Sequence, residues 1–354
     1  PMSIRWTGQL KPIVSGVYTL GMKSDDGCRV YVDGKKVIDA WTEHSVQMDE
    51  AKLEAGKTYK LQVEYFDNGG DCFAGLYWKA PSAGSQNVLA RFGDAGKVAA
   101  ECDVTVAVLG INKSIEREGQ DRFSLELPVD QQEFIKELYK VNPNTVVVLV
   151  AGSSMAVNWM DENVPAILNA WYPGEQGGNA VAEVLFGDYN PGGRLPLTYY
   201  NSLDEIPAFD NYSVKGRTYQ YFEGQPLYEF GYGLSYTTFS YSAPQSTQKE
   251  YTRQETISVS VTVTNTGDRD GEETVQLYVN DKVASVVRPV KELKAFKKIF
   301  LKAGESKTVQ FDISPLALGF YDAAMNYVVE PGEFEIMTGC NSNDLQTISV
   351  KLIN

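Results

Sequence analysis

The stretch VTVAVLGINKSIEREGQDRFSLELP, residues 104–128, decides the fold class of the middle of this chain. It begins with an apolar run, Val104 to Leu109, that is typical of a strand buried on both faces of a parallel sheet. A helical period follows Pro128, and a second apolar run spans Thr145 to Ala151. Strands that alternate with helices predict a parallel α/β sheet. Because ligands bind at the carboxyl ends of such strands, we expect the site in the loops after Leu109 and Ala151.

The same pattern continues on both sides of this stretch. Residues 94–102 are predicted to form a helix, and a third strand is expected near Ala166 to Trp171. A further helix is expected to open at Gly177-Gly178 and to close at Gly187. The sequence therefore predicts one α/β domain over residues 86–245.

Alternating apolar and polar residues flank this domain. From Gly16 to about Trp78 the chain alternates as in Tyr59 to Tyr65, with turn residues between the runs, which predicts an all-β sandwich over residues 1–85. From about Glu255 the alternation returns for about 100 residues, which indicates an immunoglobulin-like or fibronectin type III sandwich over residues 250–354. Three domains also suit 354 residues, a length that exceeds one ordinary hydrophobic core.

The composition narrows the class of ligand. The chain has 32 basic and 46 acidic residues and a net charge of −14, so it would repel nucleic acid phosphates and anionic lipid surfaces. We therefore expect a neutral ligand, with no nucleic acid partner and no membrane span. The single histidine, His44, argues against a histidine-rich metal site and a serine–histidine triad, and neither cofactor nor metal is expected. Cys28 and Cys72 either pair or, as we favour, remain free thiols.

The loop after Leu109 carries a charged cluster. Five charged residues fall within seven positions: Glu116, Arg117, Glu118, Asp121 and Arg122. Such a cluster is either a solvated loop or a catalytic one. A general acid must hold its proton near neutral pH, which neighbouring carboxylates favour and a neighbouring arginine opposes, so these residues leave the balance open.

Three segments resemble glycoside hydrolase family 3, the family of β-glucosidases and β-xylosidases. EREGQDR (residues 116–122), followed by LELP and Gln131, resembles the acid/base segment of the family. PGEQGGNAVAEVLFGDYNPGGRLPLT (residues 173–198) and YEFGYGLSYTTFSY (residues 228–241) are similar to two longer family motifs. SDDGCRVYVDG (residues 24–34) resembles the protective-antigen-like module found inserted in some glycosidases and in adhesins.

The resemblance implies a domain order. Residues 1–85 would be an N-terminally truncated protective-antigen-like β-sandwich, because the first residues already read as the middle of a folded domain. Residues 86–245 would be the C-terminal α/β sandwich domain of the family, with a mostly parallel sheet whose early strands are missing. Residues 250–354 would be a fibronectin type III-like β-sandwich. The (β/α)8 barrel of the family is absent from this chain.

The resemblance also implies residue roles. Glu118, just before the glycine, matches the acid/base residue of the family, and Glu116 is the second choice. Asp121 and Arg122 match a paired motif that is expected to structure the loop. The chain would be part of an exo-acting retaining β-glycosidase, a β-glucosidase or β-xylosidase that releases terminal glucose or xylose from oligosaccharides. The nucleophile would lie on the missing barrel half, supplied as another chain or as a removed portion of the parent, so this chain alone is expected to be inactive.

Further candidates concern sugar and calcium. Aromatic rings that could stack on sugar are Trp41, Trp159, Trp171 and Tyr172. Trp159 is preferred as the substrate-binding residue because we expect it in the loop beyond Ala151, near the site, and Trp41 is expected in the core. Asp25 and Asp26 are calcium candidates on the pattern of adhesins, or else residues of a turn. The alternative functions are a carbohydrate-binding or adhesive module without catalysis and a structural module of the cell surface. A periplasmic or extracellular location in a bacterium is expected.

Overall fold

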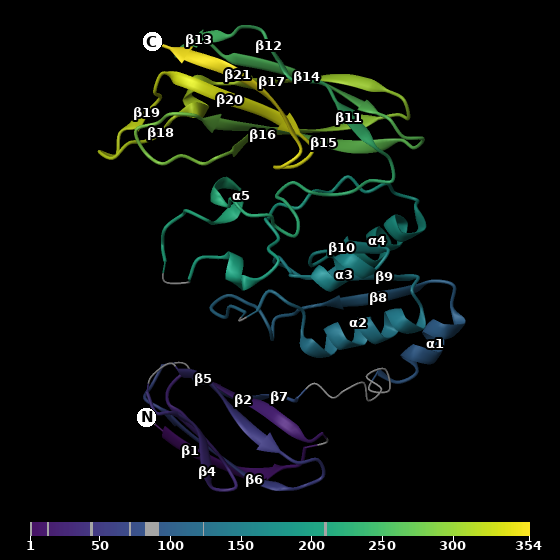
Figure 1. Cartoon of the computed structure of the whole chain (residues 1–354), viewed down its shortest axis with the longest axis vertical. Coiled ribbons are helices and arrows are strands. Elements are labelled where there is room, and N and C mark those ends of the chain that lie inside the picture. Colours follow the sequence, from purple (N-terminus) through teal and green to yellow (C-terminus); the bar gives the residue numbers. More distant parts are fainter. Residues whose placement is uncertain are drawn as a thin grey trace. The chain divides into compact units, whose positions relative to one another are not determined.

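The computed structural model describes residues 2–12, 14–42, 45–70, 72–81, 92–122, 124–208 and 211–354. The chain divides into two compact units, residues 1–88 and residues 89–354. The first unit has one hydrophobic core and the second has two. Figure 1 shows the strands and helices of both units. His44 lies outside the described residues.

The first unit consists of two antiparallel β-sheets around one core (Figure 1). One sheet has the strand order β1-β6-β3-β4 and the other the order β5-β2-β7. The bounds are β1 Met2–Leu10, β2 Gly16–Ser24, β3 Cys28–Val32, β4 Lys35–Ala40, β5 Ser45–Leu53, β6 Tyr59–Asp67 and β7 Ala74–Lys79. Tyr18, Leu20 and Met22 are buried between the sheets because alternate strand residues share a face. The predicted all-β unit is therefore confirmed.

In the first unit, the prediction for the two cysteines is confirmed and the prediction for Trp41 is wrong. Neither Cys28 nor Cys72 is part of a disulfide bond, as favoured. Trp41 is 38% exposed, so its expected place in the core is wrong. Its ring packs against Phe66, with the Arg29 guanidinium 4.2 Å from the ring centroid. An aromatic ring under a guanidinium is stabilised at the surface without full burial.

The second unit opens with the predicted parallel α/β sheet, which is confirmed in the order β10-β9-β8. The elements here are α1 Ala95–Glu101, β8 Thr105–Gly110, α2 Val129–Val141, β9 Thr145–Val150, α3 Asn158–Asn163, β10 Ala166–Asn169 and α4 Gly177–Phe186. Asn142, the residue after α2, ties the end of that helix to the end of α1, since its buried amide donates to the carbonyls of Ala99 and Cys102. The helix α4 ends as predicted at Gly187, whose φ of 80° is left-handed.

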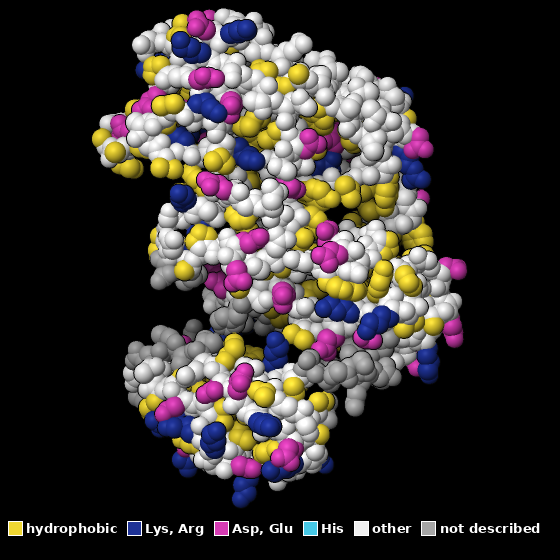
Figure 2. All heavy atoms as spheres, viewed as in Figure 1, with side chains coloured by type: hydrophobic (Ala, Val, Ile, Leu, Met, Phe, Trp, Pro, Cys, Tyr) yellow, Lys and Arg dark blue, Asp and Glu magenta, His cyan; other side chains and the backbone are white. Residues whose placement is uncertain are grey.

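One expectation for this sheet is wrong. The strand β8 is not buried on both faces, because Val106 and Val108 are 44% and 64% exposed. It is an edge strand of the sheet, and the described residues leave that face uncovered. The helix α4 also exposes apolar side chains. Gly177 is its one buried residue and Phe186 is 84% exposed. Figure 2 shows apolar side chains at the surface around this helix. Apolar strands and helices of this kind are usually covered, so the α/β region presents two open apolar surfaces.

The rest of the second unit is the predicted fibronectin type III-like sandwich, which is confirmed. One sheet has the order β11-β14-β12, with β17 also paired to β14, and the other has the order β13-β21-β20-β15-β16. Its strands are β11 Phe239–Tyr241, β12 Gln245–Ser246, β13 Glu250–Thr252, β14 Ile257–Asn265, β15 Gly271–Asp281, β16 Glu292–Leu301, β17 Ser306–Ile313, β20 Gly332–Gly339 and β21 Leu345–Ile353, with the small pair β18 Phe320–Tyr321 and β19 Tyr327–Val328. Along β14 every second residue is buried, as the alternation predicts. The helix α5 (Thr218–Tyr221) precedes this sandwich.

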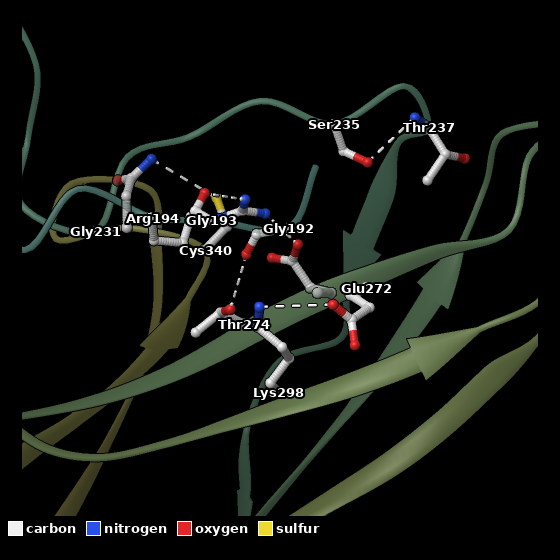
Figure 3. Close-up of polar contacts among 12 residues, drawn as sticks. Gly192, Gly193, Arg194, Gly231, Ser235, Thr237, Glu272, Thr274, Lys298 and Cys340 are labelled. Atoms are coloured by element: carbon white, nitrogen blue, oxygen red, sulfur yellow. Dashed lines mark hydrogen bonds and ion pairs between the residues drawn. The ribbon is translucent and has the colours of Figure 1, made fainter. Parts of the chain in front are cut away.

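A buried ion pair joins the α/β region to this sandwich. Arg194 donates to Glu273 of β15 at 2.5 Å, and their side chains are 8% and 1% exposed. Tyr241 donates to the other carboxylate oxygen of Glu273 at 2.6 Å. Figure 3 shows Arg194 and Gly192 beside the strand that carries Thr274, whose hydroxyl donates to the carbonyl of Gly192. These contacts hold residues 192–194 of the glycine-rich motif against the sandwich.

Candidate functional site

Glu118 lies at the tip of a tight turn in the loop after β8. Arg117 and Gln120 exchange both backbone hydrogen bonds, with N···O distances of 3.1 and 2.9 Å. Gly119 follows Glu118 with a φ of +71°, a conformation that glycine adopts without the steric cost of a Cβ. The turn leaves Glu118 exposed at its tip. The spacing Glu-Gly in the motif therefore has a physical cause, since the glycine makes the turn that presents the carboxyl group.

Glu116 has quite different surroundings. Its carboxylate accepts from Arg122 Nε at 2.5 Å and from Ser153 Oγ at 2.6 Å. The Arg122 side chain is only 8% exposed and also donates to Ser153 Oγ and to the carbonyl of Ser154. Because Ser153 and Ser154 follow β9, this network joins the loops after the first and second parallel strands. The two loops that the sequence singled out do meet, and Glu116 is held within the contact between them.

The base of the Glu118 loop is also fixed from the side of α2. The Gln131 amide bonds Gly110 twice, accepting from its N–H and donating to its carbonyl, both at 2.8 Å. Gly110 is the last residue of β8 and Gln131 lies in the first turn of α2. A side chain at Gly110 could not be accommodated, because its Cβ would clash with the carbonyl oxygen of Val150. The close approach of β8 and β9 thus places the loop at the carboxyl edge of the sheet.

These contacts separate the two candidate glutamates. Among the described residues, Glu118 has neither a hydrogen bond nor an ion pair, and its carboxyl group is open to an approaching molecule. Glu116 instead accepts both of its hydrogen bonds on Oε2, which ties its carboxylate to Arg122 and Ser153. The hydrogen bonds of Arg122 agree with the loop-structuring role that the family motif implies for it, and this role stays a prediction. Asp121 is exposed and has no hydrogen bond or ion pair with the described residues, so its structuring role also stays a prediction.

Trp159 lies away from the open edge of this site. It belongs to the helix α3, where its half-buried ring packs edge-to-face on Tyr139 with a centroid distance of 5.7 Å. Lys136 Nζ lies 5.7 Å from the same ring centroid. Tyr139 is eight residues beyond Gln131 on α2, which is about 12 Å along the helix from the carboxyl edge of β8. The structure gives no support to the predicted sugar contact of Trp159.

Tyr172 occupies the place that was expected of Trp159. It follows β10 at the carboxyl edge, is 53% exposed, and its ring fills the space beside Gly152. Trp171 before it packs half-buried against the core of the α/β region. The sequence signal for Tyr172 was its position just after the third parallel strand.

Asp25 and Asp26 lie together in the first unit. With Asp67 they form a cluster in which one carboxylate oxygen of each lies within 4.8 Å of the others. Asp26 is buried and accepts from the backbone N–H of Asn68 at 2.5 Å. Oxygen ligands in such a group suit calcium, and Asp67 is the member that sequence reasoning missed. The hydrogen bond from Asn68 equally suits a turn, so the two interpretations of Asp25 and Asp26 both stand.

Comparisons with known proteins identify the class of this chain. The sequence model of the glycosyl hydrolase family 3 C-terminal domain matches residues 15–236, and that of the fibronectin type III-like domain matches residues 273–342. The match covers the parallel α/β sheet, so the class is that of the C-terminal domain of glycosyl hydrolases. The chain belongs to glycosyl hydrolase family 3, which confirms the resemblance of its motifs. The protective-antigen-like assignment of the first unit stays a prediction.

Individual relatives agree with this assignment. A protein named periplasmic beta-glucosidase from Salmonella typhimurium is 39% identical over 299 residues, which cover 81% of this chain and 39% of the relative. A xylan 1,4-beta-xylosidase from Xylanibacter ruminicola is 34% identical over 96% of this chain and 40% of its own length. The structure of DesR, a β-glucosidase from Streptomyces venezuelae in complex with D-glucose, matches with a TM-score of 0.70 at 31% identity and covers 98% of this chain and 46% of that one. The chain thus spans less than half the length of these relatives.

Proposed function

We propose that this chain is part of an exo-acting retaining β-glycosidase that releases terminal glucose or xylose from oligosaccharides. Glu118 supplies the acid and then the base of the reaction. The observation that carries the proposal is the turn at residues 117–120, which presents Glu118 exposed and unpaired at the carboxyl edge of the sheet. The membership in family 3 supports glycoside hydrolysis, and relatives are named β-glucosidase or β-xylosidase.

The proposed reaction has two steps. Protonated Glu118 donates its proton to the glycosidic oxygen as the bond to the anomeric carbon breaks, while a second carboxylate forms the covalent glycosyl intermediate. The resulting Glu118 carboxylate then takes a proton from water, which attacks the same carbon, breaks its bond to the second carboxylate and releases the sugar. In retaining enzymes the two carboxyl groups lie about 5–5.5 Å apart. We place the second carboxylate on the barrel domain of the complete protein.

A partner region follows from this assignment. The open apolar surfaces of β8 and α4 support the proposal that a barrel half, in the same polypeptide or in another, covers part of the α/β region. Without it the covalent step has no nucleophile, and the chain alone should not turn over glycosides. No helix among the described residues has the length and apolar character needed to cross a bilayer. The relative from Salmonella is named as periplasmic, which supports a periplasmic or extracellular location.

The dependence of rate on the leaving group tests the role of Glu118. In the complete protein, Glu118→Gln should lower kcat/KM about 10²–10⁴-fold for a methyl β-glycoside, whose leaving group needs protonation. The loss should be far smaller for a dinitrophenyl β-glycoside, whose leaving group departs without a proton. Glu116→Gln, the matched control, should affect both substrates by the same factor. An equal loss for both substrates in Glu118→Gln would show that Glu118 is not the acid.

The second candidate function is a carbohydrate-binding or adhesive module. The grouping of Asp25, Asp26 and Asp67 is the observation that favours it. Calorimetry of the whole chain with glucose or xylose, with and without calcium, distinguishes the two. Calcium-dependent sugar binding that is lost in Asp26→Asn, together with a complete protein that hydrolyses no β-glycoside, would favour the module.

A further inference from the structure

Tyr172 is an exposed aromatic ring at the same sheet edge as Glu118. It follows β10 by three residues, and 53% of its surface is accessible. One side of the ring lies over the backbone of Gly152: a Cβ on Gly152 would clash with Tyr172 Cε2 and would be 3.0 Å from Cδ2. Because residue 152 has no side chain, the ring can pack directly against its backbone, while much of the ring stays open to solvent.

The backbone before Tyr172 is held in an uncommon conformation. Trp171 has a φ of 55°, the left-handed region that bulky residues rarely adopt. Its side chain packs half-buried against the α/β core, and the backbone N–H of Ala170 still donates to Leu149 as the sheet ends. The anchored Trp171 directs the next side chain outward. Strained residues of this kind persist where the surrounding structure holds them, often at ligand sites.

The residues that hold the Tyr172 ring are connected to the residues that hold the turn at Glu118. Gly152 directly precedes Ser153, whose hydroxyl donates to Glu116 and accepts from Arg122. Glu116 and Arg122 in turn flank the Glu118 turn in the chain. The ring and the carboxyl group are thus positioned by one connected set of loops after β8, β9 and β10.

From this arrangement we propose that Tyr172 is a specificity-determining residue that stacks on the sugar ring of the leaving group. The C–H face of a pyranose is apolar and its hydroxyl rim is polar, so it packs well on an open aromatic ring. In the proposed reaction the acid carboxyl protonates the glycosidic oxygen, so an open ring at the same sheet edge would lie on the leaving-group side of that bond. The ligand class is a neutral oligosaccharide with a pyranose in this position. The proposal rests on the proposed glycosidase function.

The test compares leaving groups with and without a sugar ring. In the complete protein, Tyr172→Ala should lower kcat/KM about tenfold for a β-linked disaccharide and leave that for the matching methyl β-glycoside unchanged, since methanol has no ring to stack. Tyr172→Phe should retain most of the disaccharide activity. Gly152→Ala should act like Tyr172→Ala, because its new methyl group displaces the ring. Tyr321→Ala, which removes a 60% exposed tyrosine in the sandwich, is the control and should alter neither substrate.

The outcomes separate this proposal from the function on which it rests. If Glu118→Gln loses methyl glycoside activity while Tyr172→Ala keeps the wild-type ratio of the two substrates, the stacking proposal is wrong and the enzymatic one stands. An equal loss for both substrates in Tyr172→Ala also contradicts stacking on the leaving group. If the complete protein hydrolyses neither substrate, saturation-transfer NMR tests whether Tyr172 binds the disaccharide. Binding that is lost in Tyr172→Ala and kept in Tyr172→Phe supports stacking of the sugar on Tyr172. Binding that is absent, or that survives in Tyr172→Ala, contradicts it.

Discussion

Glu116 and Glu118 are the same residue type two positions apart, but their surroundings differ. Glu116 is paired with Arg122, which is almost completely buried, and with Ser153. Glu118 is exposed on a turn that Gly119 makes. The sequence supplies the turn through its glycine, but the partner Ser153 lies 37 residues away from Glu116. Only the folded sheet brings the two loops together, so spacing alone could not exclude Glu116.

The four thiols should differ in reactivity. Cys72 and Cys102 are exposed and Cys28 is buried. At Cys340, burial, the Asp344 carboxylate and Glu273 raise the pKa of the thiol to about 12. Since the thiolate is the reactive form, iodoacetamide should label Cys72 and Cys102 at pH near 8 and spare Cys28 and Cys340. Raising the pH to about 9 should not label Cys340, because its pKa in the folded state stays higher.

Mass spectrometry of peptides checks this pattern. Unfolding in urea is the control and should expose all four cysteines to the reagent. Labelling of Cys340 in the folded protein at the rate of Cys102 would contradict the described burial.

At the scale of single elements, the helix α4 provides a matched pair of glycines. Gly187 ends the helix with a φ of 80°, and Gly178 lies inside it, where an added Cβ would meet no atom within 4 Å. Gly187→Ala should lower the free energy of unfolding by about 1 kcal/mol because alanine is strained in the left-handed region. Gly178→Ala, in the first turn of the helix, should raise it by about 0.4–1 kcal/mol, since alanine lowers the conformational entropy of the unfolded chain. Urea unfolding of both variants measures the two effects, and equal shifts of the same sign would contradict the assigned helix end.

The sequence predicts a strand or a helix end correctly where a local residue pattern has a single physical cause. Alternation along β14 follows from a sheet with one buried face, and Gly187 follows from the left-handed end of α4. The helix α3 was missed because Val157, at its start, offers no side chain to cap the helix. Trp159 was therefore expected in a loop, whereas the helix directs its ring to Tyr139. The exposed face of β8 was missed because apolar composition does not tell whether a covering segment is present.

At the scale of the whole molecule, the pair Arg194–Glu273 should be central to the stability of the second unit. Removing one partner of a buried pair leaves an uncompensated charge, so Glu273→Ala should lower the free energy of unfolding by about 3–5 kcal/mol. The double variant Arg194→Met/Glu273→Leu should recover much of this loss because neither charge remains buried. Lys97→Ala, in the exposed pair with Asp94, should change it by less than about 1 kcal/mol. Denaturant unfolding measures all three, and a Glu273→Ala variant as stable as the wild type would contradict the coupling of the two regions.

Rescue by azide tests whether Glu118 is the acid/base of a retaining β-glycosidase. In the complete protein, Glu118→Ala should form the glycosyl intermediate from a dinitrophenyl β-glycoside but hydrolyse it slowly, because no base activates water. Azide needs no base, so it should restore turnover and give the β-glycosyl azide, identified by NMR. Glu116→Ala, the control, should release the free sugar with or without azide. Formation of the β-azide by Glu118→Ala alone is the predicted result; its absence there, or its appearance with Glu116→Ala instead, would contradict the assignment.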